Sequence, residues 1–107
     1  EEIPFYFFFT RKVLMAYSAE AYLYFPGGFG TLDELFEILT LVQTGKISRL
    51  PIILVGKKFW EPLDQFIRQA LLTENQTISE GDLELYKILD DEDEIVKMVN
   101  NAPMRND

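Results

Sequence analysis

The sequence predicts an α/β fold in which a doubly wound parallel sheet lies between two layers of helices, a three-layer α/β/α arrangement. Short apolar segments alternate along the chain with longer segments of helical periodicity. The apolar segments are continuous, which is typical of strands buried on both faces of a parallel sheet. With 107 residues, 48% of them hydrophobic, the chain is expected to form one domain over residues 1–107, with a tail at 103–107. So few strands make only part of a doubly wound domain.

The expected strands are the short apolar segments, at residues 3–9, 21–25, 51–55 and 86–89. The expected helices lie between and after them, at residues 11–19, 31–44, 62–72 and 92–100. Within the second helix, apolar residues from Leu32 to Leu39 recur at three-to-four spacing, and Gly45 is expected to cap its C-terminus. Pro62 is expected in the first turn of the third helix, and Asp91 at the N-cap of the fourth.

The composition excludes several classes of site. The chain has no Cys and no His, which excludes disulfide frameworks, thiolate and imidazole metal sites, and Ser-His-Asp triads. Its 10 basic and 18 acidic residues give a net charge of −8, which argues against DNA, RNA or an anionic membrane as partner. No apolar run approaches the roughly 20 residues of a membrane-spanning helix, and no signal-peptide pattern is visible. We expect a cytoplasmic protein, and we expect no metal or cofactor in it.

The most informative segment follows the second expected strand and opens the second expected helix. It contains Gly27, Gly28 and Gly30, which allow the backbone to turn tightly and a ligand to approach it closely. The amides of such a turn, with those of the helix N-terminus, form a site suited to a phosphate. The alternative is a tight turn without a ligand, since the spacing matches neither the dinucleotide-binding pattern nor the Walker A pattern.

The residues after the glycines also have two interpretations. Thr31 and Glu34 have the spacing of a capping box, in which each side chain bonds the backbone amide of the other residue. Asp33 is then a first-turn acid that interacts favourably with the helix dipole. Alternatively, Glu34 supplies a carboxylate beside the phosphate site.

Two adjacent bases, Arg11 and Lys12, follow the first expected strand. The ends of parallel strands meet at one edge of the sheet, so Arg11 is expected near the glycine turn, where it could meet a phosphate or the Glu34 carboxylate. The alternative is a solvated pair at a helix start, where positive charge is mildly unfavourable.

The segment from Pro26 to Glu34 resembles the PGGxGTxxE motif of the LONELY GUY (LOG) family. These proteins are cytokinin riboside 5′-monophosphate phosphoribohydrolases, formerly described as lysine decarboxylases. The pair Arg11-Lys12 matches the Arg-Lys pair of the family, and residues 34–47 look like the longer bacterial members. The resemblance implies a Rossmann-like nucleotide-binding domain, of which this chain would be the C-terminal half.

By this resemblance, the 5′-phosphate of a nucleotide would be held by Gly27, Gly28, Gly30 and Thr31. Arg11 and Glu34 match the catalytic pair of the family, and Lys12 would be a further substrate-binding residue. The implied reaction is hydrolysis of the N-glycosidic bond of a nucleoside 5′-monophosphate, of the AMP or cytokinin riboside type, to free base and ribose 5-phosphate. No cofactor is implied.

Two departures from the family pattern bear on this expectation. Thr10 stands where family members often have Glu, and the N-terminal half of the family's domain does not precede Glu1. We therefore expect a preceding segment, a second chain that completes the sheet, or a homodimer or higher homo-oligomer. The alternative function is a non-catalytic protein that binds a nucleotide or a phosphorylated cofactor, as molybdenum-cofactor carriers of similar fold do. Lysine decarboxylation is disfavoured, because no pattern around the lysines indicates a pyridoxal phosphate site.

Overall fold

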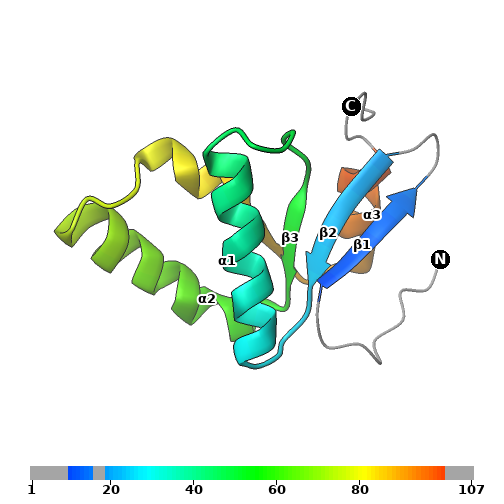
Figure 1. The fold of residues 1–107 in the computed structure, drawn as a ribbon. Coiled ribbons are helices and arrows are strands. Elements are labelled where there is room, and N and C mark those ends of the chain that lie inside the picture. The colour runs from blue at the N-terminus through cyan, green and yellow to red at the C-terminus, as the bar shows by residue number, and fades with distance from the viewer. Residues whose placement is uncertain (1–9, 16–18, 101–107) are drawn as a thin grey trace.

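The computed structural model of this chain describes residues 10–15 and 19–100. Its centre is a four-stranded sheet in the order β1-β2-β3-β4, shown in Figure 1. The strands are β1 (Thr10–Met15), β2 (Ala19–Tyr24), β3 (Ile52–Val55) and β4 (Lys87–Leu89). The last three are parallel to one another, and β1 pairs with β2 in antiparallel orientation. The three parallel strands confirm the predicted α/β class.

Helices cover both faces of this sheet, which gives the predicted three layers. The α-helices are α1 (Phe29–Gln43), α2 (Lys57–Phe66) and α3 (Glu92–Asn100). Helix α2 continues as a π-helix, η2 (Ile67–Glu74), and a 3₁₀-helix, η3 (Glu80–Leu85), leads into β4. Helices α1 and α2 lie on one face of the sheet and α3 on the other (Figure 1). None of the helices in the described part of the chain has the length and apolar character needed to cross a membrane.

The central strands β2 and β3 are buried on both faces over residues 21–24 and 52–54, as their continuous apolar sequences predict. Tyr24 packs with Leu35 and Trp60 in the core under α1 and α2, whereas Leu23 packs with Ile95 under α3. Burial of one such large side chain stabilises the fold by about 1.5–3 kcal/mol. The indole Nε1 of the fully buried Trp60 donates a hydrogen bond of 3.1 Å to the Val55 carbonyl, so α2 is fixed to the end of β3.

The expected helix at 11–19 is wrong where the structure describes it, because Thr10–Met15 form β1. A strand here pairs with the edge of β2 and satisfies backbone groups that a helix would leave exposed. The short apolar pattern in this segment fits either a helix or a strand. Pairing with β2 therefore determines that the segment is a strand. The expected strand at 3–9 lies outside the described residues.

Two helix starts differ from the predictions. Helix α1 begins at Phe29, two residues before the expected start. Helix α2 begins at Lys57, so Pro62 lies inside the helix and not in its first turn. Gly56 explains the earlier start, because it adopts φ +108° and its carbonyl accepts the first helical hydrogen bond, from the Trp60 amide at 3.1 Å.

The predicted capping residues Gly45 and Asp91 are confirmed at their helix ends. Gly45 has φ +77° and forms a Schellman motif, in which the Lys46 and Gly45 amides bond the carbonyls of Leu41 (2.9 Å) and Val42 (3.1 Å). Helix α3 has the expected bounds, and the Asp91 carboxylate accepts a hydrogen bond of 3.0 Å from the Glu94 amide at its N-terminus.

Candidate active site at the start of helix α1

The glycine segment connects the carboxyl end of β2 to α1, at the sheet edge where open α/β folds bind ligands. Gly28 is the N-cap of α1 and is exposed. A Cβ added at Gly28 would have no atom within 4 Å, so the space over the turn is open. A ligand can therefore approach the backbone of this turn closely.

The N-terminus of α1, like that of α2, has a glycine as its N-cap. Among the described residues, no side chain makes a cap hydrogen bond at Gly28, and no acid lies in the first turn of α1. In contrast, the Asp90 carboxylate accepts a hydrogen bond of 2.7 Å from the Lys57 amide at the start of α2, and Asp91 caps α3. Helix α1 thus starts without a side-chain cap from the described residues, and its N-terminal amides carry the positive end of the helix dipole.

The expected capping box between Thr31 and Glu34 is wrong, because α1 starts at Phe29 with Gly28 as its N-cap. Thr31 is instead the third helical residue and is only 1% exposed. Asp33 lies beyond the first turn and not within it. Glu34 is therefore not needed to cap the helix.

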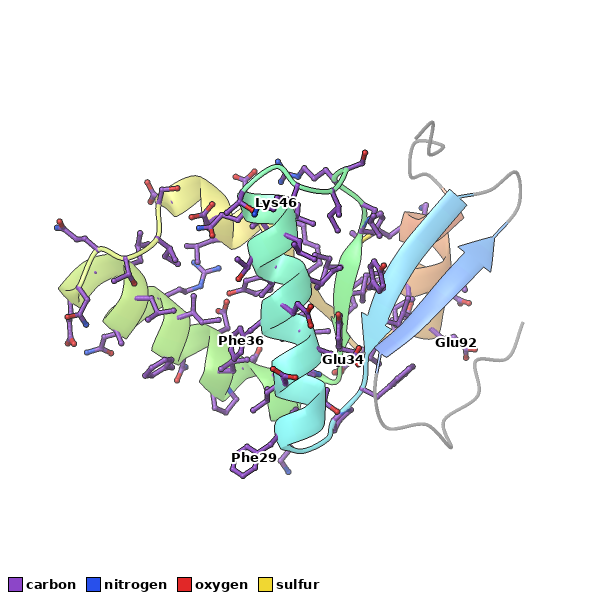
Figure 2. The ribbon with its side chains drawn as sticks, in the orientation of Figure 1. Phe29, Glu34, Phe36, Lys46 and Glu92 are labelled. Atoms are coloured by element: carbon purple, nitrogen blue, oxygen red, sulfur yellow. The ribbon has the colours of Figure 1, made fainter. Side chains whose placement is uncertain are left out.

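Glu34 is exposed on α1, one turn beyond the glycine segment. In Figure 2 it lies on the side of α1 near β2, whereas Phe36 lies on the side near α2. The Tyr24 hydroxyl donates a hydrogen bond of 3.3 Å to the Glu34 backbone carbonyl, which ties this part of α1 to the end of β2. The exposed Glu34 thus lies on the side of α1 that faces the end of β2.

The backbone of Arg11 and Lys12 also lies near this end of β2. Arg11 pairs with Leu23 and Lys12 with Tyr22, and β1 contacts α1. The sequence predicts Arg11 near this point because it would follow a parallel strand. The parallel orientation is wrong for the described segment: the start of an antiparallel β1 brings the Arg11 backbone beside the carboxyl end of β2. The side chains of both bases lie outside the described part of the structure.

Strand β3 also contributes to this edge of the sheet, which was not predicted from the sequence. A Cβ added at Gly56 would lie 3.5 Å from Cγ of Pro26, so the loops after β2 and β3 touch. Lys57 and Lys58 follow Gly56 and are exposed. The sequence feature that could have indicated this contribution is Gly56, directly after the apolar segment 51–55. Within the described residues, no group of three or more Asp or Glu side chains could hold a metal ion.

Comparison with known proteins identifies the family. The model of the family described as "Possible lysine decarboxylase" matches residues 1–99. The chain is 42% identical over 62 residues to the cytokinin riboside 5′-monophosphate phosphoribohydrolase LOG of Oryza sativa subsp. japonica, a match that covers 57% of this chain and 25% of the rice protein. It is 37% identical over 60 residues to the enzyme of the same name from Rhodococcoides fascians, covering 56% of this chain and 30% of that protein.

A third relative, LOG7 of Arabidopsis thaliana, is 42% identical over 62 residues, which are 57% of this chain and 28% of the plant protein. The chain thus spans less than a third of the length of each of these relatives. Because the family model covers residues 1–99 of 107, the chain belongs to the family described as "Possible lysine decarboxylase", the LONELY GUY family that its glycine motif indicated.

Proposed function

We propose that the protein hydrolyses the N-glycosidic bond of a nucleoside 5′-monophosphate of the AMP or cytokinin riboside type. The observation that carries this proposal is the open N-terminus of α1, which has no side-chain cap among the described residues and a carboxylate, Glu34, one turn further along. The relatives are named for this reaction on cytokinin riboside monophosphates. The proposal also places the protein in the cytoplasm, where nucleoside monophosphates occur.

The proposed phosphate site consists of Gly27, Gly28, Gly30 and Thr31. The amides of the turn and of the first helical turn would hold the 5′-phosphate, because they combine hydrogen-bond donors with the positive end of the helix dipole. The open space at Gly28 admits the phosphate oxygens. The buried Thr31 would support the turn from below.

Glu34 would act on the sugar. Cleavage of an N-glycosidic bond builds positive charge on the ribose ring, and a nearby carboxylate stabilises this charge or activates water, as in glycoside hydrolysis. Water adds to C1′, the C1′–N bond breaks, and the base leaves with a proton. Arg11 would stabilise the phosphate or the departing base, and Lys12 would add a further contact to substrate.

Decarboxylation of lysine, which the family description names, is not the reaction that we propose. It uses pyridoxal phosphate bound covalently to a lysine with a partner for the pyridine nitrogen. All lysines whose side chains the structure describes are exposed, namely Lys46, Lys57, Lys58, Lys87 and Lys97. An exposed lysine lacks the enclosed site that this chemistry requires.

The proposal includes a homodimer or higher homo-oligomer. Helices α1 and α2 carry large exposed aromatic side chains, at Phe29 (91% exposed), Phe59 and Phe66 (57% exposed). Exposed apolar side chains gathered on neighbouring helices are typical of an interaction surface. Sedimentation of the intact protein tests this part: a dimer is expected, and a monomer at all concentrations would contradict it.

The experiment that tests the function uses the intact protein with AMP, GMP, CMP, UMP and isopentenyl-AMP in ¹⁸O-labelled water. We expect release of free base, with one ¹⁸O atom in the ribose 5-phosphate formed. Folded protein that binds these nucleotides and releases no base would instead establish the second candidate, a binding protein of the molybdenum-cofactor-carrier type. The open helix N-terminus supports that candidate equally, because it needs no carboxylate.

A further inference from the structure

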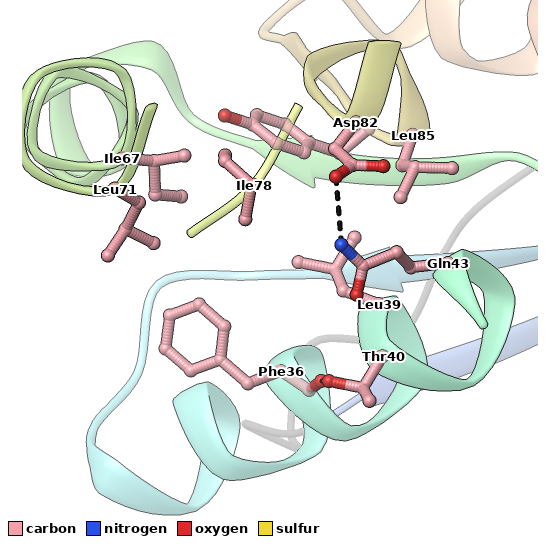
Figure 3. Close-up of a pocket in the computed structure, with 10 residues that line it drawn as sticks. Phe36, Leu39, Thr40, Gln43, Ile67, Leu71, Ile78, Asp82 and Leu85 are labelled. Atoms are coloured by element: carbon pink, nitrogen blue, oxygen red, sulfur yellow. Dashed lines mark hydrogen bonds between the residues drawn. The ribbon is translucent and has the colours of Figure 1, made fainter. Parts of the chain in front are cut away.

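A second concave site lies on the other side of α1. It is a cavity of about 160 Å³ between α1, η2 and the segment from Ile78 to Tyr86. Figure 3 shows Phe36 and Leu39 of α1 opposite Ile67 and Leu71 of η2, with Ile78 and Leu85 closing the far side. The walls are thus made by apolar side chains from three separate parts of the chain.

The local structure of η2 and of the segment after it shapes this cavity. A π-helix has hydrogen bonds between residues five positions apart. At the end of η2, the Asn75 amide donates such a bond, of 3.0 Å, to the Ala70 carbonyl. The next segment is fixed by the Thr77 hydroxyl and amide, which both bond the Leu71 carbonyl (3.1 and 2.7 Å). π-Helical segments are rare and often occur at functional sites.

One polar bridge crosses the rim of the cavity. The Gln43 side-chain amide donates a hydrogen bond of 2.8 Å to the Asp82 carboxylate, from α1 to η3, as Figure 3 shows. The same carboxylate oxygen accepts a hydrogen bond of 3.0 Å from the Ser79 amide. These donors lower the pKa of Asp82, with the Ser79 amide as the main cause, so the rim carries a negative charge at neutral pH.

We propose that this cavity binds a neutral, single-ring aromatic molecule that donates one hydrogen bond to the Asp82 carboxylate. The volume sets the size of the ligand, since roughly 150 Å³ is enough space to admit benzene. The Asp82 carboxylate at the rim determines which polar group the ligand carries, because the carboxylate accepts a hydrogen bond from a neutral donor and repels an anion. A nucleotide phosphate is therefore excluded.

The cavity is separate from the proposed nucleotide site. Gly28 caps the start of α1, whereas the cavity is lined by later residues of this helix, from Phe36 to Gln43. At 1.5 Å per residue, these lie about 12 to 20 Å along the helix axis from Gly28. Occupation of the cavity and of the glycine turn can therefore be measured independently, and the inference does not rest on the proposed function.

The test uses the intact protein and 4-fluorophenol, followed by ¹⁹F NMR, with 4-fluorobenzoate as the anionic comparison. We expect saturable binding of the phenol, with a Kd on the order of 1 mM or below, and at least tenfold weaker binding of the benzoate. Nuclear Overhauser contacts from the bound phenol to Ile and Leu methyl groups locate it in the unmodified protein. No saturable binding, or contacts to other parts of the surface, would overturn the proposal.

Variants sharpen this test. Ile78→Phe fills the cavity and should weaken phenol binding at least tenfold, whereas Leu72→Phe, at a half-buried neighbour that does not line the cavity, should leave it unchanged. Asp82→Asn keeps the shape and should reduce the discrimination against 4-fluorobenzoate. Equal binding by all variants would overturn the proposal. So would binding that weakens as protein concentration rises, because a side chain of a second copy would then be the occupant.

Discussion

The Tyr24 hydroxyl, at the end of β2, donates a hydrogen bond of 3.3 Å to the backbone carbonyl of Glu34 in α1. Tyr24 is only 1% exposed, so this bond is made largely away from solvent. It links the strand that leads into the glycine turn to the helical segment that carries the proposed catalytic carboxylate. The sheet core and the candidate site are thereby connected through one side chain.

Tyr24→Phe removes this hydroxyl and keeps the ring in the core. The free energy of unfolding should fall by about 1 kcal/mol, the typical net value of one hydrogen bond. Urea denaturation measures this change, with Tyr22→Phe on the same strand as the matched control. An unchanged unfolding free energy in Tyr24→Phe would show that the bond does not stabilise the packing of α1.

Gly28→Ala should impair nucleotide binding without unfolding the chain. The added methyl group meets no protein atom within 4 Å, so the free energy of unfolding should change by no more than about 1 kcal/mol. The methyl group occupies the space proposed for the phosphate, and we expect the KM for nucleotide to rise about tenfold. Gly81→Ala, also in open space, is the control. An unchanged KM in Gly28→Ala would show that the phosphate does not bind at this turn.

Gly56→Ala should destabilise the fold. Gly56 has φ +108°, where a side chain is strained, and the new Cβ would lie 3.5 Å from Pro26. A residue forced into such a conformation costs about 1–3 kcal/mol. Thermal and urea unfolding measure the loss. A variant as stable as the unmodified protein would mean that the loops after β2 and β3 are not constrained by Gly56.

Asp82 should make stability depend on pH in the acid range. Hydrogen bonds from the Ser79 amide, and then from Gln43, lower its pKa in the folded protein. The carboxylate therefore contributes stability above its unfolded pKa of about 4, and this contribution is lost as the pH falls through the lower folded pKa. The stability difference between the unmodified protein and Asp82→Asn should shrink as the pH falls from 6 to 2. A constant difference over that range would contradict the assignment.

Features encoded by neighbouring residues could be predicted from the sequence. The continuous apolar segments at 21–25 and 51–55 locate β2 and β3, and Asp91 and Gly45 mark helix ends through their own backbone chemistry. The glycine motif is also local in sequence, whereas the role of Glu34 comes from the resemblance to the family motif and stays a prediction.

Features that depend on contacts distant in sequence could not be predicted. The strand at Thr10–Met15 exists through its pairing with β2, and its short apolar pattern does not distinguish it from a helix. Gly28 replaced Thr31 as the N-cap because the turn is shorter than the capping pattern implied. The bond between Gln43 and Asp82 joins residues 39 positions apart, and no local signal marks it.

The central claim is that Glu34 acts on the sugar and does not merely stabilise α1. The most direct measurement compares kcat and the Kd for AMP in Glu34→Gln with those in Glu37→Gln, an exposed acid on the same helix. We expect kcat to fall at least 100-fold in Glu34→Gln, within the range for a lost acid–base group, while the Kd stays within a few-fold and Glu37→Gln is unaffected. An unchanged kcat in Glu34→Gln, or equal losses in both variants, would contradict the account.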